Sequence, residues 1–266
     1  HPNVVEVLDA GEDSDGSLYL VLELLAGHDL ASVLMRQRRL EVAETITAIA
    51  QVLQALEVAH RQGIIHRDIK PENIFLTQGV TGDTHVKLLD FGISKAIGVA
   101  EEPGLNVTQT NTTVGTPHYM SPEQARGERT IDQRADLWAV GVVMYECLAG
   151  RVPFDGDTYN DQIVKVITEP HAPLSQYDVS AELLRIVDKS LEKDRTKRYE
   201  RAAQILKDLR AFIEKHPEYS SVSAHLLREP QAPEPVVKSV PMGRPDAATM
   251  DTASDPAGGG KDRKSV

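Results

Sequence analysis

Apolar positions between residues 41 and 60 recur at steps of three and four, which predicts an amphipathic helix with one buried face. A second stretch, after Asp132, is apolar nearly all round, as expected for a helix at the centre of a protein. Two further amphipathic segments, near 181–191 and 201–214, predict helices that cover this centre. The pattern therefore indicates a mostly helical body.

Shorter apolar segments, found mainly near the start of the chain, predict β-strands. Residues 4–7 and 18–23 flank a polar turn at 12–16, and two more short strands are expected around 74–76 and 86–89, joined by a glycine-rich turn. No internal repeat is visible in the sequence. The sequence thus predicts an α+β fold in which a short strand pair precedes the helical body.

Composition narrows the class of protein. Hydrophobic residues make up 41% of the chain, which is enough to fill a sizeable core. The net charge of −11 argues against a general nucleic-acid binder. No apolar run approaches the roughly 18 residues that a membrane span needs, so no membrane segment is expected within this chain. The single cysteine, Cys147, fits a reducing compartment and favours a cytoplasmic location.

The end of the chain differs in composition from the rest. From Ser220 onward six basic and six acidic residues cancel, aromatic residues are missing, and six prolines and a Gly258-Gly259-Gly260 run occur. Such a composition cannot bury enough apolar area to offset its ordering entropy. We therefore predict a disordered linker or tail over residues 217–266.

The strongest chemical signal is His-Arg-Asp-Ile-Lys-Pro-Glu-Asn at residues 66–73, followed by Asp-Phe-Gly at 90–92. Phosphoryl transfer from a nucleotide needs one carboxylate to orient the attacking hydroxyl and accept its proton, which suits Asp68. It also needs oxygen ligands for magnesium, which suits Asn73 and Asp90. An isolated Asp-Phe-Gly is as easily a turn between strands, but the matched pair of motifs favours the chemical interpretation.

With these motifs the sequence resembles the eukaryotic-like, bacterial Hanks-type serine/threonine protein kinases. The resemblance implies that Asp68 is the catalytic base, Asn73 the ligand of a second magnesium ion and Asp90 the principal magnesium ligand. Lys70, two residues after the catalytic aspartate as in Ser/Thr rather than Tyr kinases, would contact the transferring phosphate. The implied cofactors are ATP and Mg²⁺, with Mn²⁺ as a substitute.

The same resemblance implies structural roles for other residues. His66 and Phe91 would stack in the column of side chains that aligns the active site, anchored by Asp136, which would cap the backbone of the catalytic loop. Glu123 lies in a Ser-Pro-Glu variant of the family's Ala-Pro-Glu and would pair with Arg198.

Regulation is implied by a threonine-rich loop between the Asp-Phe-Gly motif and Gly115, although such a loop can also be merely solvated. Arg67 precedes the catalytic aspartate, which in the family marks kinases that loop phosphorylation activates. A phosphate of about −2 charge that pairs with Arg67 would order the loop. Thr112 or Thr113 is the expected phosphosite, and Thr116 is a further regulatory candidate.

The nucleotide base is expected at residues 18–30, which resemble the family's strand-to-hinge segment. The backbone of Glu23 and Leu25 would bond adenine, Asp29 would reach the ribose and Phe75 would pack under the ring. Leu25 and Phe75 are otherwise ordinary core or surface apolar positions.

The chain departs from the family at its start. It begins with His1 rather than methionine, contains no G-x-G-x-x-G motif there, and has its first lysine at Lys70. The glycine-rich loop, the phosphate-binding lysine and the regulatory helix with its glutamate are therefore missing. We expect a truncated kinase domain: a remnant of the N-lobe and hinge at 1–25, a complete C-lobe at 26–216 and the tail.

This departure leaves more than one function open. A protein kinase would act on Ser or Thr of protein substrates and could self-associate for autophosphorylation, but a fragment should be poorly active alone. The alternative is a catalytically impaired, pseudokinase-like scaffold or binding module. A small-molecule phosphotransferase is disfavoured, because those enzymes lack the Gly-Thr-Pro-His-Tyr segment found at 115–119. The tail leaves room for a membrane anchor beyond it.

Overall fold

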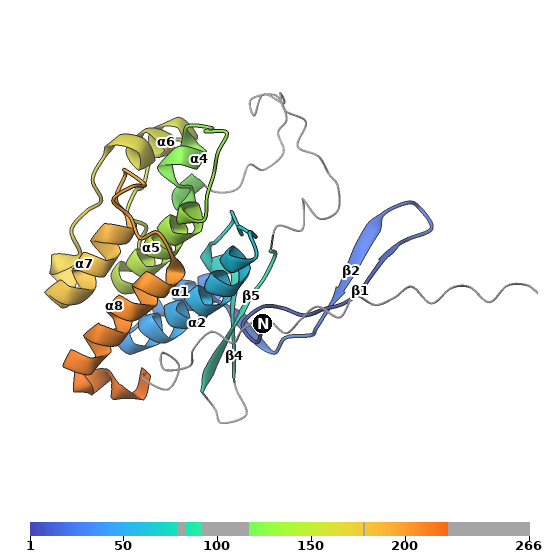
Figure 1. The fold of residues 1–266 in the computed structure, drawn as a ribbon, viewed down its shortest axis with the longest axis horizontal. Helices are drawn as coiled ribbons and strands as arrows, with labels where there is room; N and C mark the ends of the chain where they lie inside the picture. The colour runs from blue at the N-terminus through green and yellow to red at the C-terminus, as the bar shows by residue number, and fades with distance from the viewer. Residues whose placement is uncertain (79–82, 92–116, 178, 223–266) are drawn as a thin grey trace, which may run out of the picture. The chain divides into compact units, whose positions relative to one another are not determined.

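A computed structural model describes residues 1–78, 83–91, 117–177 and 179–222 of the chain (Figure 1). In chain order the elements are β1 (Val7–Glu12), β2 (Leu18–Leu22), β3 (Gly27–Asp29), α1 (Leu30–Gln37), α2 (Val42–Arg61), η1 (Pro71–Asn73), β4 (Ile74–Gln78), β5 (Thr84–Leu88), η2 (Pro117–Tyr119), α4 (Pro122–Ala125), α5 (Arg134–Ala149), α6 (Tyr159–Thr168), η3 (Leu174–Tyr177), α7 (Ala181–Ser190), α8 (Ala202–Lys215) and η4 (Pro217–Val222). This α+β architecture confirms the predicted fold class.

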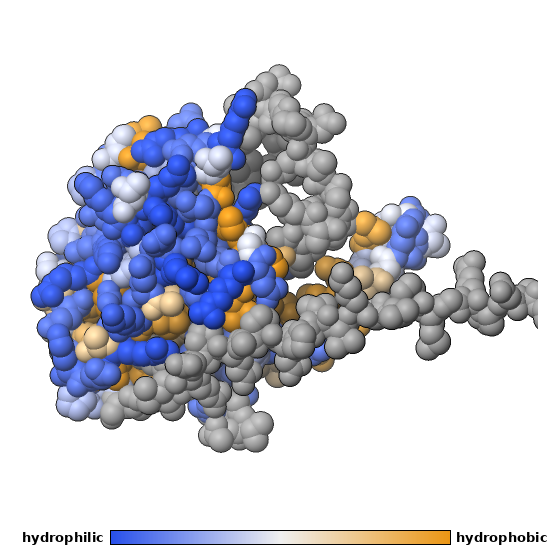
Figure 2. Space-filling view, viewed as in Figure 1, coloured by the Kyte–Doolittle hydropathy of each residue, from blue (hydrophilic) through white to orange (hydrophobic). Residues whose placement is uncertain are grey.

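Helices α2 and α5 form the centre of the body, and α7 and α8 pack against them (Figure 1). Trp138 and Tyr145 of α5 are completely buried, in agreement with the nearly all-round apolar pattern. A capping box between Glu41 and Glu44 starts α2, and the left-handed Gly150, at φ 70°, ends α5. The visible outer surface of the body is mostly hydrophilic (Figure 2), so the apolar side chains of these helices are used for the core.

Helix α2 corrects one expectation from composition. Among the described helices it is the one long and apolar enough to cross a membrane, with a mean hydropathy of 1.3 over its best window. However, 78% of that window is buried inside the protein. The prediction that no apolar run approaches membrane length was therefore wrong, but the burial is that of a core helix.

The strands form two antiparallel sheets, the β1–β2 hairpin and the three-stranded sheet β3–β4–β5. The first strand begins later than predicted, because residues 3–5 run along β5 instead of joining the hairpin. Val5 N–H donates to the carbonyl of Leu88, and Leu88 N–H donates to the carbonyl of Asn3. Hydrogen bonding of this segment is thus satisfied by β5, and β1 starts at Val7.

The body continues beyond residue 216, where the C-lobe was predicted to end and the tail to follow. The turn η4 follows α8, and its last residue, Val222, is buried against the core. Residues 223–266, and with them most of the predicted tail, lie outside the described residues, as does the turn at 79–82.

Candidate active site

The predicted catalytic residues converge in the loop that joins α2 to β4. Lys70 Nζ lies 2.7 Å from Asp68 Oδ2, and the side-chain nitrogen of Asn73 donates to the same oxygen at 3.0 Å. Asn73 also donates to the backbone carbonyl of Asp68 at 2.7 Å. Pro71 begins the short helix η1, which turns the chain so that Asn73 faces back toward Asp68. The Asp68 side chain is 59% exposed, so a substrate hydroxyl can reach it.

The carboxylate of Asp136, in α5, holds the backbone of this loop. It accepts the N–H of His66 at 2.9 Å and the N–H of Arg67 at 2.7 Å. His60 at the end of α2 contacts the same carboxylate at 2.7 Å through its ring Nε2. His60 could not be predicted from the sequence, because it precedes the motif and carries no signal of its own. The loop is thus fixed by a buried acceptor at the start of α5.

The ring of His66 links this loop to the Asp-Phe-Gly segment. It lies 4.7 Å from the ring of Phe91, measured between centroids, and its Nε2 bonds the carbonyl of Leu89 at 2.8 Å. Burial lowers the pKa of His66, against the opposing effect of Asp136, so the imidazole is held neutral. A neutral ring can donate to Leu89 while it packs against Phe91 at a tilt of 56°.

Two of the candidate positions have unusual backbone conformations. Arg67 has φ 70° and Asp90 has φ 56°, in the left-handed region that costs most non-glycine residues free energy. Strained residues of this kind persist where surrounding bonds determine them and are typical of functional sites. Among the described residues, the one other non-glycine residue with a positive φ is Arg38, at the end of α1.

The donor set fits a magnesium ion. The side-chain nitrogen of Asn73 is used toward Asp68, which leaves its amide oxygen as the group that would bind a cation. The backbone carbonyl of Asn73 accepts the N–H of Leu89 at 2.9 Å, so Asp90 follows directly on a segment bonded to Asn73. Mg²⁺ prefers a few such oxygen ligands and keeps several waters. The described residues contain no cluster of three or more His, Cys, Asp or Glu side chains that could hold a metal ion, so a cation here would rely on Asn73 and Asp90 together with water and phosphate oxygens.

Glu123 and Arg198 form a buried, bidentate ion pair with distances of 2.7 and 2.6 Å. Their side chains are 3% and 0% exposed. Burial alone would raise the pKa of Glu123, but Arg198 outweighs it and the pKa is lowered, so the carboxylate stays charged. This pair connects α4 to the segment before α8.

The predicted nucleotide-binding residues are engaged in contacts of their own. Glu23 N–H donates to the Glu6 carbonyl, which leaves the Glu23 carbonyl for a base, while its carboxylate contacts Lys87 at 2.5 Å. Both carboxylate oxygens of Asp29 accept from Ser32 at 2.7 Å. Asp29 is therefore the N-cap of α1, a role that the sequence analysis did not predict.

The remaining predicted residues differ in burial, and some of them lie outside the described residues. Phe75 pairs with Asp29 across β3 and β4 and is half-buried, as is Leu25. Arg67 is exposed. Thr112, Thr113 and Thr116 lie outside the described residues, so the predicted phosphosite stays a prediction.

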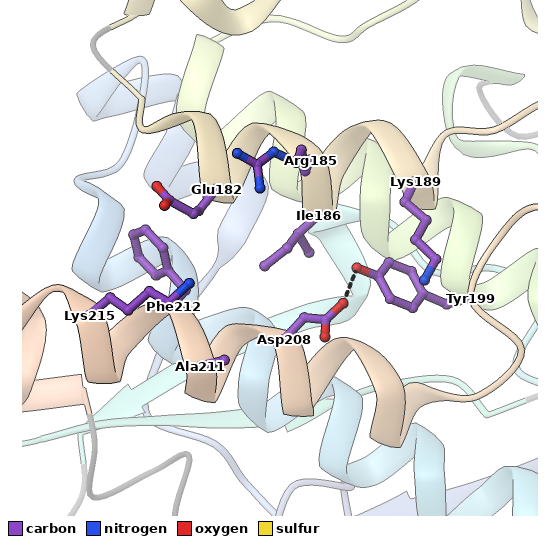
Figure 3. Close-up of a pocket in the computed structure, with 9 residues that line it drawn as sticks. All are labelled: Glu182, Arg185, Ile186, Lys189, Tyr199, Asp208, Ala211, Phe212 and Lys215. Atoms are coloured by element: carbon purple, nitrogen blue, oxygen red, sulfur yellow. Dashed lines mark hydrogen bonds between the residues drawn. The ribbon is translucent and has the colours of Figure 1, made fainter.

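Two pockets in the described part of the chain lie away from these residues. One of about 270 Å³ between α7 and α8 is shown in Figure 3. There Tyr199 donates to Asp208 at 2.7 Å, and Lys189 Nζ lies 4.1 Å from the centre of the Tyr199 ring. A larger one, of about 590 Å³, lies between α1, α2 and the three-stranded sheet. Neither is lined by a predicted catalytic or nucleotide-binding residue.

Comparison with known proteins agrees with the site. The protein kinase domain family matches residues 1–209. The serine/threonine-protein kinase pkn3 of Myxococcus xanthus is 43% identical over 65% of this chain and 31% of its own length. A probable serine/threonine-protein kinase of Streptomyces coelicolor is 40% identical over 82% of this chain and 32% of its own.

The serine/threonine-protein kinase PknB of Mycolicibacterium smegmatis is 37% identical over 99% of this chain and 41% of its own length. The chain therefore spans 31% to 41% of the length of these relatives.

Proposed function

Because the chain belongs to the protein kinase domain family, we propose that it transfers the γ-phosphoryl group of ATP to Ser or Thr hydroxyls of proteins. The observation that carries the proposal is that Lys70 and Asn73 both contact the exposed carboxylate of Asp68. The serine/threonine kinases among its relatives support the same class of acceptor.

Asp68 would accept a hydrogen bond from the substrate hydroxyl and take its proton as the oxygen attacks. Lys70, 2.7 Å from Asp68, places a positive charge where the transferring phosphoryl group would pass. Asn73 and Asp90 would hold Mg²⁺, which when bound neutralises phosphate charge. Because the loop is fixed by Asp136, much of the expected rate enhancement comes from positioning and electrostatics prepared before the substrate binds.

Phosphorylation of Thr112 or Thr113 is the proposed means of regulation. Arg67 is exposed beside Asp68, and a guanidinium pairs well with a phosphate. Mapping of phosphopeptides after incubation with ATP should find phosphate within residues 105–116. Phosphate found only elsewhere would contradict this part of the proposal. We also propose a cytoplasmic location, where ATP is found and Cys147 would stay reduced. Two copies of the chain would associate during autophosphorylation.

The decisive experiment measures transfer of labelled γ-phosphate from ATP to a serine-containing protein substrate in the presence of Mg²⁺. Asp68→Asn removes the base and should lower kcat by about 10²- to 10⁴-fold. Asp13→Asn, a matched change in an exposed turn, should leave kcat unchanged.

Equal activity of the Asp68→Asn variant and the unmodified chain would overturn the proposal. Binding of ATP with no transfer by the unmodified chain would instead support the alternative, a non-catalytic binding module.

A further inference from the structure

Gln124 occupies the end of the first turn of α4, where its side chain completes a capping box. Its Oε1 accepts the N–H and the hydroxyl of Ser121, both at 3.0 Å, and its own N–H donates to the Ser121 hydroxyl at 3.4 Å. A capping box satisfies backbone groups that the start of a helix otherwise leaves without partners. One half of the Gln124 amide is thus used for local structure.

The other half of the amide reaches a different part of the chain. Gln124 Nε2 donates to the backbone carbonyl of Arg67 at 3.2 Å, across 57 positions of sequence. The orientation of the amide is fixed by its partners, because the N–H of Ser121 can only donate and the carbonyl of Arg67 can only accept. Gln124 therefore connects the start of α4 to the residue that directly precedes Asp68.

Arg67 is one of the left-handed residues, with φ 70°. Its N–H is held by Asp136 Oδ1 at 2.7 Å, and its carbonyl is held by Gln124. The two peptide groups that flank the strained residue are thus bonded to side chains of two separate helices, α5 and α4. A strained conformation persists only when its surroundings determine it, and here the second of these bonds comes from Gln124.

We propose that Gln124 is a positioning residue for Asp68. Gln124 holds the Arg67 carbonyl, so that the Asp68 carboxylate faces the substrate. Glutamine suits both tasks because one amide supplies an acceptor for the cap and a donor for the loop. A glutamate would keep the acceptor but would direct a carboxylate at a carbonyl oxygen. The inference rests on the proposed function, since positioning matters only if Asp68 performs catalysis.

The chain offers a matched control in Gln204, which has the same place in the capping box of α8. Its Oε1 accepts the N–H of Arg201 at 3.3 Å and that of Glu200 at 2.8 Å. Gln124→Glu and Gln204→Glu are therefore the same isosteric change at the same helical position. They differ in whether the amide nitrogen also holds the catalytic loop.

The test measures steady-state kinetics of phosphoryl transfer, Tm, and hydrogen exchange of a peptide that spans residues 64–70. The bond is exposed to solvent, so Gln124→Glu should lower kcat by no more than about five- to tenfold, with both KM values unchanged within about twofold. The 64–70 peptide should exchange faster. Gln204→Glu should change neither kcat nor this exchange, and Tm should shift equally little in both variants.

A pH profile provides a readout that a purely structural role would not move. The introduced carboxyl can donate to Arg67 once it is protonated, so the deficit in kcat should narrow as pH falls toward about 5. Equal kcat values for the two variants, or a deficit that does not depend on pH, would overturn the proposal. If the unmodified chain transfers no phosphate, the proposed function fails, and unchanged exchange at 64–70 in Gln124→Glu would still refute the positioning role.

Discussion

In the helical body the large apolar side chains of α2 and α5, such as Leu53 and Trp138, are completely buried, whereas in the β1–β2 hairpin Leu8 and Leu18 are 58% and 54% exposed. The two regions also hold the site differently. Asp136 and Gln124 of the body fix the backbone before Asp68 with bonds from two helices. The hairpin ends next to Glu23, which is held by Lys87 and by the backbone of Glu6.

The two halves of the proposed reaction therefore depend on regions of unequal stability. Regions with few buried apolar contacts open at low free-energy cost, and regions in the core open only with global unfolding. The groups proposed to perform proton transfer therefore belong to the stable part of the protein. The residues expected to bind the base lie next to a two-stranded hairpin, which has little stability of its own.

The largest effect is expected in the body. Glu123→Gln removes one charge of the buried pair and leaves Arg198 as an unpaired cation, so the free energy of unfolding should fall by about 3–5 kcal/mol. Urea unfolding followed by circular dichroism measures it. Glu128→Gln, at half-exposed pairs with Arg126 and Arg195, is the control and should cost less than about 1 kcal/mol. A similar loss of unfolding free energy in both variants would contradict the larger contribution expected from the buried pair.

A pH dependence of stability should also originate in the body. Burial, together with the neighbouring Arg198 guanidinium, lowers the pKa of Lys193 to about 7, from 10.5. Between these values the unfolded chain binds a proton that the folded chain does not, so stability rises with pH. From pH 6 to 8 the free energy of unfolding should rise by up to about 1 kcal/mol, after allowance for partial exposure.

The comparison that isolates this effect uses two lysines above aromatic rings. Lys193 Nζ lies 3.5 Å from the centre of the Phe154 ring, and Lys189 Nζ lies 4.1 Å from that of Tyr199, but Lys189 is exposed. Lys193→Met should remove this contribution to the pH slope, and Lys189→Met should keep it. A slope that survives in Lys193→Met would show that another group causes it.

A smaller effect is expected where the hairpin meets the rest of the chain. Lys87→Met breaks the pair with Glu23, whose side chains are 17% and 25% exposed, and should lower the free energy of unfolding by about 1 kcal/mol or less. The backbone amides of β1 and β2 should nevertheless exchange faster, because this pair ties the end of the hairpin to β5. Hydrogen exchange that changes in α5 instead would remove the distinction between the two regions.

The smallest effect is expected within the hairpin itself. Leu8→Ser exchanges an exposed apolar side chain for a polar one and should alter the free energy of unfolding by no more than about 0.5 kcal/mol. The buried counterpart, Leu53→Ala in α2, should cost about 2–5 kcal/mol. Thermal unfolding of both variants makes the contrast direct, and a large loss in Leu8→Ser would show that Leu8 is buried in solution.

The sequence predicted the long helices because their apolar positions repeat over many turns. It missed α1 and α6, in which only two residues each are buried, Leu30 with Leu34 and Gln162 with Val166. The signal of these helices lies in their caps. Asp29 accepts from Ser32 N–H, and Thr158 accepts from Asp161 N–H, a local chemistry that periodicity does not detect.

In the candidate site, contacts within one loop could be predicted from the sequence, and contacts between distant helices could not. Asp68, Lys70 and Asn73 could be predicted to meet because they share one loop. The contact of Gln124 with Arg67, 57 positions away, and that of His60 with Asp136, 76 positions away, depend on how whole helices pack. No spacing within a single motif encodes such contacts, so they required the structure.

The apolar character of α2 has a consequence for synthesis of the chain on the ribosome. Its partners α5 and α8 end at Ala149 and Lys215, long after Arg61 has been added. At about 5–20 residues per second, α2 waits on the order of ten seconds for them, with apolar side chains that these helices later help to cover. We expect a nascent chain arrested before Arg134 to be held by a chaperone, and one extended beyond Lys215 to be released.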